Sequence, residues 1–130
     1  MITKINYPNS FIGNVHWSQI SDYYSKAHVV VNYSINNDIN LRIFEGVGAG
    51  ALVITNRILN NGFEEIFEEG RHLVVFDDIF KEMVEKIDYY LKNREEREKI
   101  AKEGFEYVRE NHTYRHRLIK MFEIMGYRLE

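Results

Sequence analysis

The chain has 130 residues, with 45% apolar and 28% charged residues, a formal net charge of -3 at pH 7 and no cysteine. This length fits one domain with a single core, and the composition is that of an ordinary soluble globular protein. The negative charge, without a basic stripe, argues against a nucleic-acid partner, and the lack of cysteine excludes disulfides and thiolate metal sites. The sequence shows neither a secretion signal nor a membrane span, so we predict a cytoplasmic protein.

Apolar runs of strand length alternate with segments of helical periodicity. Strands are predicted at 28–34, 51–55 and 72–76, and a short apolar run at 11–14 brings the expected sheet to about four strands. Helices are predicted at 17–26, 40–50, 63–69, 79–91, 93–109 and from 113 onward. This alternation is typical of βαβ units and predicts a single α/β domain with a Rossmann-like parallel sheet, flanking helices and a helical C-terminal tail.

Two of the predicted helices start with capping signals. Asn93 and Glu96 have the spacing of a capping box, and Thr113 precedes the last helix. The charged residues from 94 to 106 are interpreted as a solvated helix face.

The segment 40–56 is the most informative part of the chain, because a short helix runs through three glycines and leads straight into a buried strand. Each glycine costs about 1 kcal/mol relative to alanine in a helix interior, so something must approach the helix closely. Packing against the adjacent strand is the favoured explanation, and direct contact with a ligand is the alternative. The glycines are Gly46, Gly48 and Gly50.

Side chains around this helix separate into an apolar side and a charged side. Arg42 and Glu45 lie one turn apart on the charged side, either as a solvated ion pair or as a binding face for a phosphorylated, sugar-like ligand. The apolar side consists of Leu41, Ile43, Phe44, Val47 and Gly48.

Polar residues follow each predicted strand at its carboxyl end, where ligands bind in parallel sheets. The helix that carries Arg42 starts at this same edge. Tyr33 and Ser34 lie at the carboxyl end of the first strand and are therefore either ligand neighbours or ordinary loop residues.

The order and spacing of these segments resemble the nucleotide-sugar site of glycosyltransferases with the GT-B fold. More narrowly, they resemble the "glycosyl transferases group 1" branch that includes the CgeB-type spore-coat proteins. The resemblance covers roughly residues 11–118 and rests on 11–15, 25–34, 40–55 and 93–113. It implies that residues 1–130 form one domain, the donor-binding C-terminal half of a two-domain hexosyltransferase of polysaccharide biosynthesis. The acceptor-binding N-terminal domain would then be missing, and this part alone would be inactive.

The resemblance also implies roles for single residues. Glu45 corresponds to the second glutamate of the family's E-x7-E motif and would accept hydrogen bonds from ribose hydroxyls. Backbone N–H groups of Arg42, Ile43 and Phe44 would face the diphosphate. Tyr33 and Ser34 would lie near the diphosphate or the sugar.

The chain departs from the family pattern in two ways. Asn37 stands where the first glutamate of the motif, which contacts the donor sugar, is expected. The arginine and lysine that neutralise the diphosphate lie upstream, in strands that this chain does not have. The expected ligand is a nucleotide-diphosphate sugar as substrate, with no further cofactor, and no metal-ligand spacing or nucleophile constellation is apparent.

Other interpretations stay open. The chain is alternatively a non-catalytic interaction module that retains the half-fold, while a flavodoxin-like or response-regulator-like domain is disfavoured because the first strand lacks an acidic cluster at its end. His16, next to Trp17, is either a loop residue or a neighbour of the base. The basic cluster at the start of the last helix is a solvated face, a docking surface for a missing domain or an anion site. It consists of His112, Arg115, His116 and Arg117.

Overall fold

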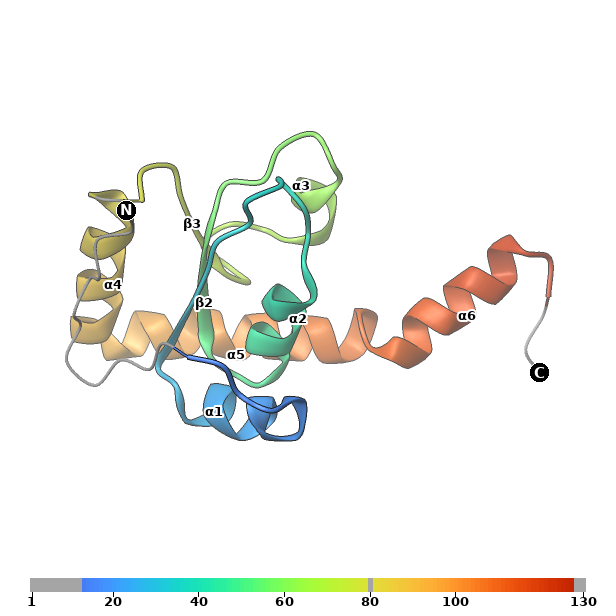
Figure 1. Ribbon diagram of the computed structural model, residues 1–130, viewed down its shortest axis with the longest axis horizontal. Coiled ribbons are helices and arrows are strands. Elements are labelled where there is room, and N and C mark those ends of the chain that lie inside the picture. Colours follow the sequence, from blue (N-terminus) through green and yellow to red (C-terminus); the bar gives the residue numbers. More distant parts are fainter. Residues whose placement is uncertain (1–12, 80, 128–130) are drawn as a thin grey trace.

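The computed structural model describes residues 13–79 and 81–127 (Figure 1). Three strands form one parallel sheet in the order β1-β2-β3: Val29–Asn32 (β1), Leu52–Asn56 (β2) and Val74–Phe76 (β3). A 3-10 turn, Trp17–Gln19, precedes the first helix. The α-helices are Ile20–Lys26 (α1), Leu41–Gly48 (α2), Phe63–Ile66 (α3), Glu82–Lys92 (α4), Arg94–Asn111 (α5) and Tyr114–Ile124 (α6).

The predicted α/β class and the parallel sheet are confirmed, but the expected count of about four strands is wrong. The described residues contain three strands. Half of the run at 11–14 lies outside the described residues, and Gly13 and Asn14, which are described, adopt no strand. None of the helices among the described residues is both long enough and apolar enough to cross a bilayer.

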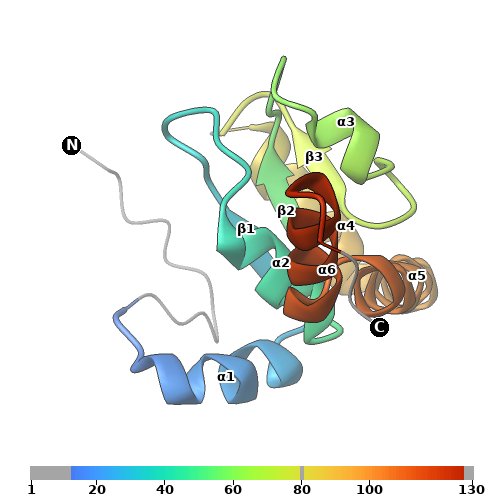
Figure 2. The ribbon, with the colours of Figure 1, turned by 90° about the vertical axis from the view of Figure 1, so that its right-hand side faces the viewer.

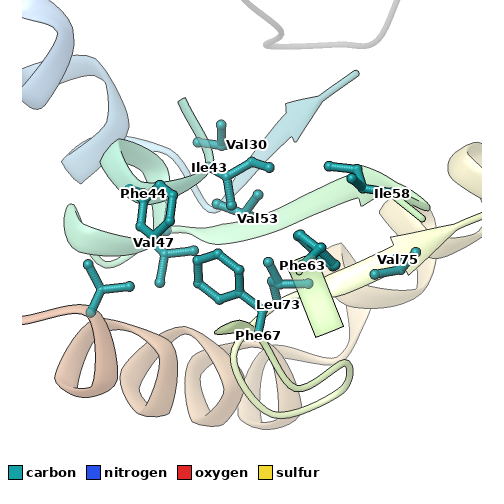
Figure 3. Packing of buried hydrophobic residues seen from close by; sticks show 12 residues of the cluster. Val30, Ile43, Phe44, Val47, Val53, Ile58, Phe63, Phe67, Leu73 and Val75 are labelled. Carbon is teal, nitrogen blue, oxygen red and sulfur yellow. The ribbon is translucent and has the colours of Figure 1, made fainter. Parts of the chain in front are cut away.

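The sheet has an apolar cluster on each face, because successive side chains of β2 point to opposite faces and are buried on both. Val53 points into the cluster under α2 and α3, whereas Leu52 and Ile54 point into the cluster under α4. Figure 3 shows the first cluster, in which Phe44 and Phe67 pack with ring centroids 5.1 Å apart.

Helix α5 closes both clusters. Its residues Ile100 and Ala101 pack in the cluster under α4, and Val108, two turns later, packs in the cluster under α2. Figure 1 shows α5 extending across the domain, while α6 continues away from it. Helix α1 packs beside α2, at the end of the molecule opposite to α3 (Figures 1 and 2).

Gly104 lets α5 approach the loop before β3 closely. A Cβ atom at this position would overlap the backbone carbonyl oxygen of His72 and would lie 3.0 Å from Cγ1 of Val47. Backbone cannot move aside as a flexible side chain can, so the absence of a side chain at Gly104 sets the spacing between α5 and the sheet.

One predicted helix cap is confirmed and the other is wrong. Thr113 caps α6, and a true capping box forms with His116, whose Nδ1 accepts from the Thr113 N–H at 3.3 Å. Asn93 makes no side-chain cap for α5. It donates instead to the Tyr89 carbonyl oxygen at 2.8 Å, and Glu96 accepts from the Tyr89 hydroxyl at 2.7 Å. The tight turn between α4 and α5 explains this, because it draws both side chains back to α4.

Arg97 is the exception to the predicted solvated face of α5. It is 5% exposed, and its Nη1 donates to the carbonyl oxygens of Tyr90 at 2.8 Å and Leu91 at 3.2 Å. These carbonyls belong to the last turn of α4 and have no partner within their own helix. Arg97 therefore stabilises the end of α4 from the neighbouring helix.

Glu82 is expected to make stability depend on acid pH. Its carboxylate accepts from the backbone N–H of Asp77 at 2.6 Å and pairs with Lys86 at 2.7 Å. The Lys86 contact first, and then the Asp77 N–H, lower the pKa of Glu82 from 4.5 to about 2. A lowered folded-state pKa contributes stability that is complete above pH 4.5 and is lost as pH falls towards 2.

Urea unfolding of Glu82→Gln measures this contribution. The variant should be less stable than the wild type at pH 7, and the difference should shrink between pH 4.5 and pH 2. Glu95→Gln, on the exposed first turn of α5, is the control and should show no such trend. A gap between E82Q and the wild type that is equal at pH 7 and pH 2.5 would contradict the assignment.

Candidate functional site

A pocket of about 390 Å³ lies between the start of α2 and the junction of α5 with α6. It brings Glu45, the main sequence-predicted site residue, together with His112 and Arg117 from the basic cluster. The lining residues are Ile39, Leu41, Phe44, Glu45, Val108, His112, Thr113, Tyr114 and Arg117.

The sequence around α2 explains why its start is presented at this edge. Asn40 is extended, with φ -80° and ψ 161°, so the chain enters the helix directly from the loop after β1. Ile43 and Val47 are fully buried and anchor the helix on the sheet. Leu41 was predicted on the buried side but is 51% exposed, because the first residue of the helix extends past the core and lines the pocket.

The three glycines of the predicted helix have different roles, and Gly50 lies beyond α2, which ends at Gly48. A Cβ atom at Gly46 would lie 2.7 Å from Cγ2 of Val53 and 3.4 Å from Cγ1 of Val30, which supports packing on the sheet. Gly48 is exposed rather than on the buried side, and a Cβ there would meet only Val108, at an ordinary 3.5 Å. Gly50 has φ +84° and turns the chain into β2, a conformation that side chains disfavour.

Arg42 and Glu45 form no ion pair with each other or with any other described residue. Arg42 is exposed and Glu45 is half-buried. Both lie near Tyr24 of α1: burial raises the pKa of Tyr24, the charge of Glu45 raises it further, and the charge of Arg42 opposes this. The solvated ion pair is therefore not formed, and of the two residues only Glu45 lines the pocket.

Ser34 and Tyr33 lie at the end of β1 but outside this pocket. Ser34 is buried, and its hydroxyl donates to the backbone carbonyl oxygen of Asp38 at 2.7 Å while its N–H donates to Oδ1 of Asn56 at 2.6 Å. Its polar atoms thus hold the loop after β1. Tyr33 is 46% exposed and stacks on the buried Phe76 with ring centroids 6.4 Å apart.

Asn37 ties this loop to the loop after β2. Its Nδ2 donates to the carbonyl oxygen of Leu59 at 2.6 Å, and its Oδ1 accepts from the Leu59 N–H at 2.8 Å. Its φ of 55° lies in the left-handed region, which asparagine tolerates better than most residues. Both ends of the amide are thus used within the protein.

His112 and Arg117 complete the pocket. The guanidinium carbon of Arg117 lies 4.3 Å from the ring centroid of Phe44, a cation–π contact, and Arg117 forms no ion pair among the described residues. The His112 ring lies 5.7 Å from the Phe44 ring. Burial lowers the pKa of His112, and the charges of Arg117 and His116 lower it further.

The remaining predicted neighbours are elsewhere. His16 is not at this pocket; its Nδ1 lies 2.8 Å from the Ser18 hydroxyl and its ring 5.5 Å from Trp17. Within residues 13–79 and 81–127, no group of three or more histidine, aspartate or glutamate side chains is arranged to hold a metal ion.

Comparisons with known proteins show the family and the fold of the chain. A family model described as "Glycosyl transferase-like" matches residues 4–123. Comparison with curated proteins gives no match.

Among solved structures, the chain is similar to the C-terminal domain of a glycosyl transferase group 1 family protein (LpcC) from Francisella tularensis. The TM-score is 0.66 at 21% identity, and the match covers 80% of this chain and 53% of that one. This likeness shows the fold, which is that of a GT-B C-terminal domain. The chain spans about half the length of the solved domain.

Proposed function

The chain belongs to the glycosyl transferase-like family, and from this membership we propose that it binds the nucleotide-diphosphate sugar donor of a glycosyltransferase. The full-length enzyme would transfer the sugar, of the hexosyl type, to a glycan acceptor. The observation that carries the proposal is the start of α2, where Glu45 lines an open pocket and Arg42 lies one turn before it, neither of them in an ion pair with a described residue.

The start of α2 supplies the chemistry that a diphosphate leaving group needs. Backbone N–H groups of the first helical turn are favourable partners for an anion, and the helix dipole adds to this. Among Arg42 to Phe44, the Ile43 N–H donates to the Asn40 carbonyl oxygen at 3.3 Å and would have to be shared with the diphosphate. The Arg42 guanidinium contributes a full positive charge at the same end. Charge that develops on the diphosphate as the sugar leaves would be stabilised there, without a covalent nucleophile from this segment.

Glu45 would hold the nucleoside rather than the phosphates. A carboxylate accepts hydrogen bonds from two neighbouring hydroxyls, which fits the ribose of a nucleotide. The side chain is one turn beyond the helix start, so ribose and diphosphate would lie side by side along α2.

The acceptor side would come from polypeptide outside this chain. Helix α6 buries none of its residues, and it extends away from the domain (Figure 1). An acceptor-binding N-terminal domain that covers the apolar side chains of α6 would account for their exposure. They are Leu118, Met121 and Ile124, and the exposed Met125 and Tyr127 follow directly after the helix.

One observation favours the alternative of a non-catalytic interaction module. Asn37 supplies no carboxylate for the donor sugar, and its amide is engaged with Leu59. A module of this kind would retain the half-fold without sugar transfer.

Isothermal titration calorimetry of the full-length protein with UDP and with GDP tests donor binding. Glu45→Ala should weaken the better-bound nucleotide about tenfold or more, as expected for loss of hydrogen bonds to a charged group. Glu85→Ala, an exposed glutamate on α4, is the matched control and should leave affinity unchanged. Absence of binding at millimolar nucleotide would overturn the donor role and favour the interaction module.

A further inference from the structure

Tyr107 fixes where His112 carries its proton. The Tyr107 hydroxyl oxygen lies 2.5 Å from the carbonyl oxygen of Ile66, which can only accept, so the single hydroxyl hydrogen is donated there. The same oxygen lies 2.9 Å from Nε2 of His112 and has only a lone pair left for it. In the neutral ring, Nε2 must therefore carry the hydrogen and donate it, which leaves Nδ1 as an acceptor.

The Tyr107 side chain is held firmly in this position. Its ring stacks on that of His72 at a centroid distance of 4.0 Å and an angle of 5°, and its other neighbours include the Phe67 ring at 6.3 Å. His72 is itself oriented by the Glu68 N–H, which donates to its Nδ1 at 3.2 Å. The hydrogen bond from His112 to Tyr107 is thus part of a packed unit.

Nδ1 of His112 remains open. It has no hydrogen-bond partner among the described residues. It is also not one of their fully buried side-chain atoms that lack a partner, which are the amide oxygens of Asn32 and Asn40, so a ligand can reach it. His112 lines the pocket beside Glu45. Burial and the nearby cations lower its pKa, so at neutral pH the ring is uncharged and Nδ1 keeps its lone pair.

The pocket walls next to this acceptor suit a flat group, because most of them are apolar, with Glu45 and with Arg117, which lies over the Phe44 ring, as the charged side chains. Ile39, Leu41 and Val108 contribute aliphatic surface, and the Phe44 ring contributes an aromatic one. A nucleobase has this shape and offers hydrogen-bonding atoms at its edge. Uracil, thymine and guanine carry a ring N–H there, whereas cytosine and adenine present a ring nitrogen with a lone pair.

We propose that His112 determines which nucleobase this site accepts, with its Nδ1 accepting a hydrogen bond from the ring N–H of a uracil-, thymine- or guanine-type base. This rests on the proposed function, which places a nucleoside diphosphate in the site. A base of the cytosine or adenine type would set its own lone pair against that of Nδ1, and both would lose a partner.

Calorimetry on the full-length protein with two ligand pairs tests this: UDP against CDP, and GDP against ADP. Each pair shares ribose and diphosphate. The wild type should prefer UDP or GDP over its counterpart about tenfold, since one hydrogen bond and one unsatisfied group separate them. His112→Phe keeps a ring against Phe44 but removes both nitrogens, so the preference should fall to about one. His28→Phe, at an exposed histidine, should keep it.

Tyr107→Phe and the ring-nitrogen NMR signals of His112 keep the test decisive if His112→Phe does not fold. In the wild type, Nδ1 should have the chemical shift of an unprotonated nitrogen, and this chemical shift should change when UDP or GDP binds. Tyr107→Phe should mix the two tautomers and reduce the preference. Nucleotide binding that depends on Glu45 but moves neither His112 nitrogen, or equal affinity within each pair, would overturn the inference and leave the proposed function intact. Absence of all nucleotide binding would overturn both.

Discussion

Replacing Gly104 with alanine is expected to lower the free energy of unfolding by about 3 kcal/mol, even though alanine is the better helix former. The added methyl would overlap the His72 carbonyl oxygen and press on Val47. Helix α5 would have to move away from the sheet, and because it closes both apolar clusters, packing on both faces would loosen.

Urea or thermal unfolding measures this, and Gly48→Ala is the matched control. Gly48 also lies in a helix, but a Cβ there meets only Val108, at 3.5 Å. This variant should gain up to about 1 kcal/mol from helix propensity. If both alanines were equally tolerated, the close approach at Gly104 would not be what sets the position of α5.

Replacing Asn37 with glutamate, which restores the family's E-x7-E motif, is expected to destabilise the protein by about 2–3 kcal/mol and to add no transferase activity. A carboxylate cannot donate to the Leu59 carbonyl oxygen, so one hydrogen bond is lost outright. The longer side chain also fits the left-handed φ of 55° less well than asparagine does.

Asn60→Glu separates the two causes. Asn60 has a similar φ of 58°. Its replacement should therefore lower the free energy of unfolding only through the strain of a glutamate in the left-handed region, by about 1 kcal/mol. Unfolding of N37E and N60E under the same conditions gives the contribution of the contact with Leu59 by difference. A gain in sugar transfer by N37E in the full-length enzyme would show that the position still faces the donor.

Local signals in the sequence were enough to predict the α/β class and the three strands of the sheet. Continuous β-branched runs such as 28–34 and 72–76 identified the strands, and the glycines of α2 pointed to close packing, which Gly46 makes on Val53. The expected fourth strand failed because a four-residue apolar run carries too little information. Arg97 was missed for a related reason, since its partners on α4 depend on how two helices meet.

The site was only partly predictable. Glu45 and Arg42 were found from the helix start and the resemblance, but the approach of His112 and Arg117 to Phe44 depends on the direction that the chain takes after α5. The unusual row of cations at the start of α6 was a usable signal. The role of Ser34 could not be read from its position at a strand end, because its partner Asn56 belongs to another strand.

The order of the strands has a consequence for how the protein folds as it is synthesised. Because β1, β2 and β3 lie in the sheet in the order in which they leave the ribosome, each new strand can pair at once with the one made before it. Helices α2, α3 and α4 cover parts of the two faces as they are made, but α5, which closes both clusters, comes after them, so the packing of the nascent sheet stays incomplete until residue 108 has emerged. We therefore expect the half-made chain to be the form that most needs chaperones, and that need to end once α5 has docked through Gly104 and Val108.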